Sequence, residues 1–371
     1  MTTVTFELDG LQSLIDLLGR DGWTVMGPRI ADGVVTHTRI ESLDDLPRGT
    51  GDEQEAARYR LRPRDDDAVF GYAAGPQSWK PVLFPARELL RRSAGHDDPP
   101  AEAPRVALVG VRSCDLHAIA VHDRVLLARD AVDVHYAERR DRVLVVAVTC
   151  SDPGGTCFCA SMGTGPDPRE GFDIALTELL DDAGHRFVAR AGTDRGAELL
   201  GRLATSPTSD ADLAAAAGVV DRATSAMGRE LDTTDLRDLL YAAAEHPQWD
   251  DVARRCLACG NCTLVCPTCF CTTVTDTTSL VDGKSERWRE WDSCFTGELT
   301  HLESGDVRSS TRSRYRQWAT HKLAAWWDQF GTSGCVGCGR CITWCPAAID
   351  ITAEVAAIRS TASATQHESE A

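Results

Sequence analysis

The sequence predicts an α/β N-terminal domain over residues 1–245, followed by a smaller cysteine-rich domain over residues 246–355 that carries a mostly helical insertion at 272–334. In the first half, short apolar runs alternate with helical patterns, which is typical of α/β folds. Near residue 246 this alternation ends, and cysteines, tryptophans and prolines become dense. With 371 residues, of which 43% are hydrophobic, the chain can form two or three domains with a sizeable core.

The N-terminal segment predicts a helix followed by a hairpin. Leucine and isoleucine residues between 11 and 18 recur at helical spacing, and the pattern stops at Gly22. Residues 24–30 and 34–40 have strand character and flank the turn Ala31-Asp32-Gly33.

The middle of the N-terminal half predicts a βαβ-like unit. Residues 105–111 and 142–149 are short apolar runs, and 115–127 between them has helical spacing. The pattern continues with a helix at 174–180, a strand at 186–191 and a helix at 196–203. The segment 204–218, rich in Ala, Ser, Asp and Thr, is predicted to be a surface connection or a weak helix.

The two ends of the second half are also predicted from composition. The domain boundary is placed at about 241–249, where the composition changes. Residues 356–371 are mainly Ser, Thr, Glu and Ala, so they are predicted to form a disordered tail.

Charge and cysteine content restrict the class of function. The formal net charge of −17 opposes binding to nucleic acid or to an anionic membrane. The first ten residues have no export-signal pattern, and no apolar run approaches the roughly 18 residues of a membrane span, so a cytoplasmic location is expected. In that compartment the fifteen cysteines are expected to be metal ligands, redox groups or buried apolar residues rather than disulfides.

Two cysteine runs share the spacing C-x2-C-x2-C-x3-C-P. One contains Cys256, Cys259, Cys262 and Cys266, and the other contains Cys335, Cys338, Cys341 and Cys345. In such runs three thiolates bind one [4Fe–4S] cluster, and the fourth binds the neighbouring cluster. One cluster is therefore assigned to Cys256, Cys259, Cys262 and Cys345, and the other to Cys335, Cys338, Cys341 and Cys266.

This pairing predicts a two-[4Fe–4S] ferredoxin-like domain, whose glycines Gly260, Gly337 and Gly339 allow backbone amides to approach sulfur. A tetrahedral zinc site is the alternative, but zinc sites usually pair C-x2-C with a second, distant pair of ligands. The insertion between the runs is too long for a loop and must form structure of its own.

A third iron–sulfur site is a further hypothesis for the N-terminal half. Two predicted strands run into Cys114 and Cys150, and a glycine-rich loop carries Cys157 and Cys159. Ligands of open α/β sheets bind at the carboxyl ends of strands, so these four thiols would meet if the strands are adjacent and parallel. The alternative is that they are small buried residues near a partner surface, since their spacing fits no standard cluster motif.

The remaining features are less specific. Cys269, Cys271 and Cys294 are interpreted as packing beside a cluster, with a supporting or replacement ligand as the alternative. Between residues 307 and 322 there are five basic residues and no acid, which would offset cluster charge, dock an acidic partner or form a solvated helix face. No dinucleotide fingerprint, P-loop or Ser/His/Asp arrangement is present, so catalysis by this chain alone is not expected.

Over nearly its whole length the chain resembles the iron–sulfur β subunit of cytoplasmic [NiFe] sulfhydrogenases and the related A subunit of anaerobic sulfite reductase. The motifs that carry the resemblance are GVRSCD at 110–115, CFCASMGTGP at 157–166, CPTCFC at 266–271, WDSC at 291–294 and CVGCGRC at 335–341. The resemblance implies a component that relays electrons between the large and small subunits of a hydrogenase and a flavin- and NAD(P)-binding diaphorase subunit. It also favours the third site.

The sequence therefore predicts a non-catalytic electron-transfer subunit with two [4Fe–4S] clusters, and a third under the additional hypothesis. The A subunit of an anaerobic sulfite reductase is the alternative within the same chemistry. A zinc-stabilised scaffold without redox function is the alternative outside it.

Overall fold

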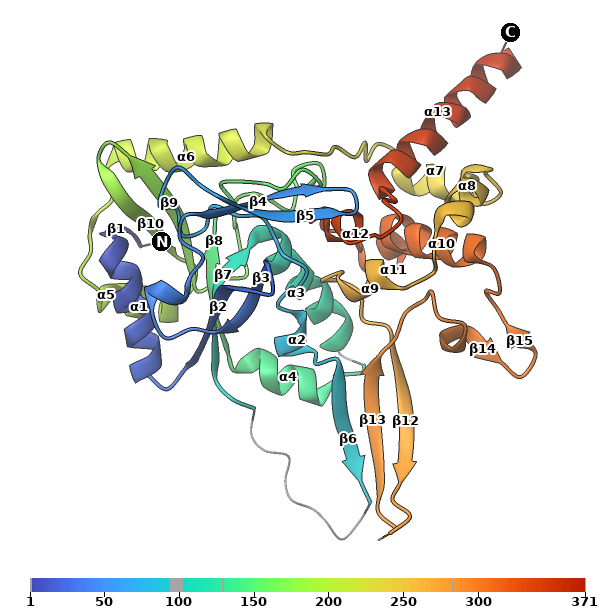
Figure 1. Cartoon of the computed structure of the whole chain (residues 1–371), viewed down its shortest axis with the longest axis horizontal. Helices are drawn as coiled ribbons and strands as arrows, with labels where there is room; N and C mark the ends of the chain where they lie inside the picture. The colour runs from blue at the N-terminus through green and yellow to red at the C-terminus, as the bar shows by residue number, and fades with distance from the viewer. Residues whose placement is uncertain (1, 94–102, 129, 282, 371) are drawn as a thin grey trace.

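The computed structural model describes residues 2–93, 103–128, 130–281 and 283–370. An eight-stranded mixed sheet forms the centre of the N-terminal half (Figure 1). β2, β7, β8 and β9 are parallel neighbours, and the outer pairings are antiparallel. In sheet order the strands are β11 (Ser206–Pro207), β1 (Thr3–Glu7), β10 (Gly184–Ala191), β9 (Ile174–Asp181), β8 (Val143–Val148), β7 (Val106–Arg112), β2 (Thr24–Ala31) and β3 (Val34–Arg39).

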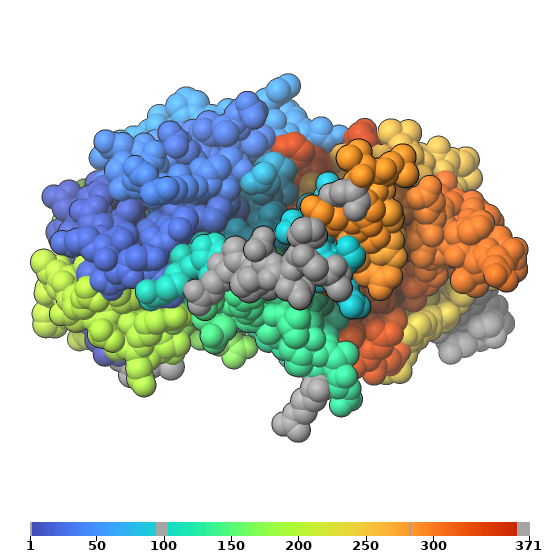
Figure 2. Space-filling model, turned by 90° about the horizontal axis from the view of Figure 1, so that it is seen from below, coloured from blue at the N-terminus to red at the C-terminus, as the bar shows by residue number. Residues whose placement is uncertain are grey.

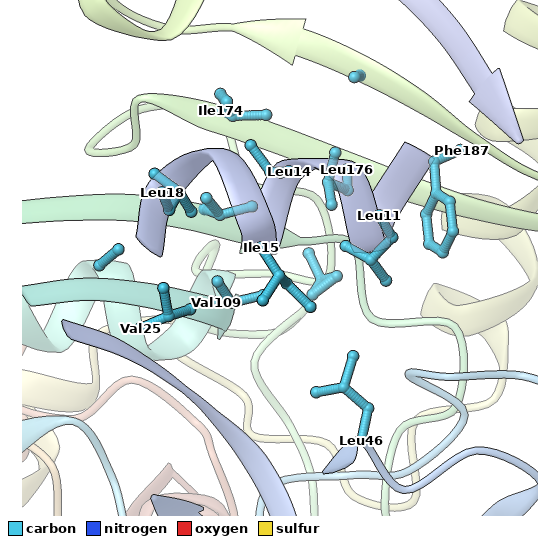
Figure 3. Close-up of a cluster of buried hydrophobic side chains, with 14 of the residues drawn as sticks. Leu11, Leu14, Ile15, Leu18, Val25, Leu46, Val109, Ile174, Leu176 and Phe187 are labelled. Carbon is cyan, nitrogen blue, oxygen red and sulfur yellow. The ribbon is translucent and has the colours of Figure 1, made fainter. Parts of the chain in front are cut away.

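One face of the sheet packs against α1 (Leu8–Arg20) and α5 (Asp194–Gly201). Figure 3 shows the α1 side chains Leu11, Leu14 and Leu18 directed at residues of the sheet. The predicted helix and the predicted β2–β3 hairpin are both present. The apolar side of α1 is buried against this face of the sheet, which stabilises the helix.

Other helices cover the opposite face. α3 (Ser113–Leu126) and α4 (Val134–Asp141) connect β7 to β8, as the predicted βαβ unit requires, and α2 (Lys80–Leu83) packs beside them. α6 (Asp210–Ser225) packs against β9 and β10. Of the two alternatives predicted for 204–218, the helix is present from residue 210, because the Ser209 hydroxyl accepts the Asp212 N–H and caps it.

The predicted helix at 174–180 is wrong, since these residues lie in β9. Ile174 and Leu176 face the α1 side, whereas Ala175 and Leu179 face the other. A strand that is buried on both faces is apolar at consecutive positions, so its pattern cannot be distinguished from that of a short buried helix.

The second half is built from short helices around its own core. That core joins Leu236 and Leu240 to Trp249, Phe295 and Trp318. Its helices are α7 (Leu236–Ala242), α8 (Gln248–Arg255), α9 (Asn261–Leu264), α10 (Thr311–Thr320), the π-helical turn η3 (His321–Ala325), α11 (Trp326–Phe330), α12 (Arg340–Thr343) and α13 (Ile351–Glu370).

The insertion at 272–334 is not mostly helical, which corrects the prediction. It begins with the hairpin β12 (Thr272–Thr278) and β13 (Ser285–Trp291), and β13 pairs with β6 (Arg87–Arg92) of the N-terminal half. The 3-10 turn η2 (Glu298–Thr300) leads into the hairpin of β14 (His301–Leu302) and β15 (Gly305–Asp306), and a second 3-10 turn, η1 (Leu43–Asp45), lies in the N-terminal half. Pairing with β6 completes a sheet that local sequence patterns do not reveal.

The segment predicted to be a disordered tail continues α13, which projects from the molecule in Figure 1. Val355 and Ile358 anchor the start of this helix in the second core. Ala and Glu have good helix propensity, which is compatible with continuation of the helix beyond the anchor.

The two halves meet along a broad contact, visible as the junction of blue-green and orange-red surfaces in Figure 2. The hairpin of β4 (Thr50–Glu55) and β5 (Arg58–Pro63) contributes to this contact, since Gln54 accepts the Thr343 hydroxyl. A buried ion pair joins Arg340 to Asp115 at 2.8 Å. None of the helices in the described residues combines the length and the apolar character needed to span a bilayer.

Candidate iron–sulfur site

The first cysteine run lies in a loop between α8 and α9. Cys256 ends α8, and its Sγ accepts the N–H of Ala258 at 3.3 Å. Gly260 has φ +76° and begins α9, which carries Cys262. Cys259 is exposed, so one edge of this set faces the surface.

A largely apolar cavity joins this run to the end of the second run. Its walls include the four thiols assigned to the first cluster, Cys256, Cys259, Cys262 and Cys345, together with Cys341. Cys345 thus reaches the first run, as the crossing pattern predicts. Two buried polar atoms on the cavity wall, Tyr315 Oη and Trp318 Nε1, have no hydrogen-bond partner among the described residues. The sulfur atoms of a cluster in this cavity, from thiolates and inorganic sulfide, would accept hydrogen bonds from these two donors. The cavity wall therefore fits a [4Fe–4S] cluster.

The second set is grouped around α12. Lys322 Nζ lies 3.1 Å from Cys266 Sγ and 3.4 Å from the carbonyl oxygen of Gly334, which precedes Cys335, so Cys266 of the first run lies beside the second run. Burial is the main cause of the raised pKa of the Cys341 thiol, and neighbouring thiols add to it. Metal binding displaces such protons, so a buried, neutral thiol is compatible with a ligand role.

A buried cation accompanies the second set. Lys322 Nζ lies 3.1 Å from Cys266 Sγ and 2.9 Å from the Thr268 hydroxyl. Hydrogen bonding from Cys269, with the Lys322 charge, holds the pKa of Cys266 well below its usual range. Burial alone would lower the pKa of Lys322, but the surrounding thiols outweigh it and raise that pKa. The Lys322 ammonium group is therefore a fixed counter-ion that favours the thiolate form of Cys266.

The four N-terminal cysteines line one cavity. β7 and β8 are adjacent and parallel, so Cys114 and Cys150 leave the same edge of the sheet. Cys157 and Cys159 reach this edge from the loop that follows, and the cavity is lined by all four thiols. The structure therefore brings together the residues of the hypothetical third site.

Arg112 supplies positive charge to this cavity. Its guanidinium donates to the carbonyls of Phe70, Tyr72 and Thr149, and its Nε has no partner among the described residues. A buried donor and a full positive charge beside four thiols fit an anionic cluster.

Cys338 connects the second set to the third. It lines the N-terminal cavity, and the Cys157 Sγ lies 3.8 Å from its carbonyl oxygen. Gly337 and Gly339 permit this approach, because a Cβ on Gly337 would lie 2.6 Å from the Phe158 carbonyl oxygen. These two glycines therefore allow close contact between the halves, and their predicted role in the approach of amides to sulfur stays a prediction.

Cys269, Cys271 and Cys294 line a separate cavity with Lys322 and Arg308. Of the five basic residues noted in the sequence, Lys322 contacts a thiol, and Arg312 and Arg316 pair with Glu245 on the surface. Within 307–322, Lys322 thus supplies positive charge beside a thiol, whereas Arg312 and Arg316 belong to the solvated surface.

Sequence reasoning missed two buried charged residues. Lys80 donates to the carbonyls of Leu264, Cys266 and Cys269 and lies 3.8 Å from the centre of the Trp291 ring. Asp115 was noted only as part of a motif, although it fixes Arg340 of the second run. Neither role has a local sequence signal, because the partners are more than 180 residues away along the chain.

Within the described residues, no group of three or more His, Cys, Asp and Glu side chains is arranged to hold a single metal ion. Ligands of a cubane each bind a different iron, so they surround a volume rather than converge on one point. Paired runs in which the last cysteine of each lies beside the other run are typical of dicluster iron–sulfur proteins.

Comparison with known proteins agrees with this class. The family model of the 4Fe-4S dicluster domain matches residues 255–349. Sulfhydrogenase 2 subunit beta of Pyrococcus furiosus is 34% identical over 249 residues, which cover 66% of this chain and 72% of that protein. No solved structure significantly matches the chain. The chain belongs to the family of sulfhydrogenase β subunits.

Proposed function

We propose that this chain relays single electrons through a contiguous series of [4Fe–4S] clusters inside a hydrogenase complex. The observation that carries this proposal is the sharing of residues between neighbouring thiol sets. Cys341 belongs to the second set and lines the cavity of the first, while Cys338 belongs to the second set and lines the N-terminal cavity. Three sets linked in this way form a path rather than isolated sites.

The proposed ligands follow the crossing pattern. The first cluster takes Cys256, Cys259, Cys262 and Cys345, the second takes Cys335, Cys338, Cys341 and Cys266, and the third takes Cys114, Cys150, Cys157 and Cys159. When bound, each cluster supplies a centre that gains and loses one electron. The chain itself excludes water and provides counter-charge.

The second and third sets are the more enclosed parts of the path. Lys322 and Arg340 place positive charge beside the second set, and Arg112 does so beside the third. Cation charge near a thiolate-ligated cluster stabilises its reduced form, which carries one more negative charge. Electrons arriving at the surface-facing first set are thus drawn inward.

The partners proposed are the large and small subunits of a [NiFe] hydrogenase on one side and a flavin- and NAD(P)-binding diaphorase subunit on the other. Membership in the sulfhydrogenase β family supports a hydrogenase complex. We further propose that the chain has no catalytic centre of its own and works in the cytoplasm without nucleic-acid or membrane partners.

Anaerobic purification with metal analysis tests this function. The isolated chain should carry about eight iron atoms for the two paired sets and about twelve with the third. Dithionite should produce paramagnetic signals. Four or fewer iron atoms would contradict the pairing, and a colourless protein that contains zinc would support the scaffold.

Identification of co-purifying subunits separates the two redox alternatives. A nickel-containing large subunit supports the hydrogenase complex. A sirohaem-containing partner would replace it with the sulfite reductase assignment.

A variant tests the N-terminal site directly. Cys157→Ser should lower the iron content by about four atoms per chain and leave the signals of the two paired clusters in place. An unchanged iron content would remove the third cluster from the proposal.

A further inference from the structure

The three sets described above account for twelve of the fifteen cysteines, and the remaining three lie together. Cys269 and Cys271 precede β12 directly, and Cys294 follows β13. Antiparallel pairing of Thr272 with Trp291 closes this hairpin at the cysteine end. The Asp292 N–H donates to the Cys271 carbonyl at 2.9 Å, so the two cysteine segments are held side by side.

These thiols line a cavity whose walls also carry basic side chains. Its walls include Arg308, His321 and Lys322, and all three cysteines are free. Thiols that serve only as small apolar residues are usually packed against other apolar atoms. A cavity that combines three thiols with two permanent cations is instead suited to an anionic metal–sulfur group.

An unpartnered polar atom at this cavity is an independent indication of a ligand. The Nε of Arg308 is buried and has no hydrogen-bond partner among the described residues. Arg308 lines the cavity, and a buried donor without an acceptor is costly unless a bound group satisfies it.

The local backbone is unusual beside the cavity. His321 and Lys322 lie on the π-helical turn between α10 and α11, and both line the cavity. π-Helical turns are rare and are found frequently at functional sites. Histidine nitrogen replaces cysteine as an iron ligand in some iron–sulfur centres, and His321 is the histidine that lines this cavity.

We infer that Cys269, Cys271 and Cys294 hold an additional iron–sulfur cluster, with His321 as the ligand of its remaining iron. This inference rests on the proposed electron-relay function and extends it. Trp318 lines both this cavity and that of the first set, and Lys322 reaches from this cavity to Cys266 of the second. The cluster accepts one electron from one neighbouring cluster and passes one electron to the other, and no bond is made or broken.

The test compares full-length proteins reconstituted anaerobically with iron and sulfide. The variant Cys269→Ala/Cys271→Ala/Cys294→Ala should lose about four iron atoms and about four sulfides relative to the unaltered chain. The paramagnetic signals of the other clusters should persist. Thr275→Ala/Thr277→Ala, on the same hairpin, is the matched control and should retain the full iron content.

Equal iron content in the triple variant and the unaltered chain would overturn the inference, as would a loss of zinc instead of iron. If the triple variant does not fold, total iron in the unaltered chain decides: about sixteen atoms support the site and about eight or fewer exclude it. At about twelve atoms the Cys157→Ser variant decides, because retention of about twelve supports the site and a fall to about eight excludes it. His321→Ala should alter the spectrum of one cluster while the thiols remain, and an unchanged spectrum would remove His321 as a ligand. Failure of the proposed function is distinct, because the unaltered chain would then hold no reducible iron.

Discussion

The two cysteine runs have identical spacing but opposite environments. In the first run Cys259 and Asn261 are exposed and Leu257 is 67% exposed. In the second run the corresponding intervening residues are buried, with Val336 at 3% and Arg340 at 1% exposure. The same cysteine spacing thus lies at the surface in one case and in the interior in the other.

The difference arises from what each run contacts. The second run packs against the loop 156–159 and against Asp115, which belong to the N-terminal half. The first run contacts mainly the second core and is open on one side. In the proposed relay, environment rather than ligand set would therefore distinguish the point of electron exchange from the interior of the path.

The largest effect is expected from alanine at Gly339. Both Gly339 and its counterpart Gly260 have positive φ, so each alanine costs roughly 1–2 kcal/mol of backbone strain. A Cβ at Gly339 would also lie 2.4 Å from the Thr156 carbonyl oxygen, whereas the nearest atom to a Cβ at Gly260 is the Ser293 hydroxyl oxygen at 3.1 Å. Gly339→Ala should cost about 3 kcal/mol or more and release iron. Anaerobic thermal unfolding and iron analysis measure both, and equal midpoints for the two variants would contradict the comparison.

An effect of similar size on stability is expected from loss of the ion pair between the halves. Arg340→Leu leaves Asp115 buried without a partner, which should lower the free energy of unfolding by about 3–5 kcal/mol. Asn261→Ala at the matching position of the first run should change it by less than about 0.5 kcal/mol. Denaturant titration of both variants checks this. Recovery in Asp115→Asn/Arg340→Leu would show that the unpaired charge, rather than lost packing, is the cause.

Removal of the Lys322 charge should change a reduction potential while the fold persists. Lys322→Met takes a positive charge from beside Cys266, so the reduction potential of the second cluster should fall by on the order of 100 mV. Arg316→Met, which removes a surface charge paired with Glu245, should leave that potential unchanged. An anaerobic redox titration followed by paramagnetic resonance separates the clusters, and equal shifts in both variants would refute the specific role of Lys322.

The smallest effect on the molecule itself is expected at Leu257. Leu257→Glu should leave stability within about 0.5 kcal/mol of the unaltered chain and should retain the iron content. Electron exchange with the partner should slow, because a charge is introduced beside the exposed edge of the first set. The rate of hydrogen-dependent reduction in the reconstituted complex tests this, and an unaltered rate would place the exchange surface elsewhere.

The sequence alone determined the features that depend on short spacing. Three thiols separated by two residues each can bind one cluster independently of the fold of the rest of the chain. The two runs could therefore be recognised from the sequence alone. The helix α1, the β2–β3 hairpin and the β7–α3–β8 unit were also predictable, because their apolar periods reflect local geometry.

Only the tertiary structure decided what depends on distant residues. β9 has the same apolar pattern as a buried helix, and β13 becomes a sheet strand by pairing with β6. The grouping of Cys269, Cys271 and Cys294, the contacts of Lys80 and the pairing of Arg340 with Asp115 all join segments that the sequence keeps apart. Such contacts leave no local periodic signal because their partners are set by packing of the whole chain, and this packing gives two identical motifs different environments.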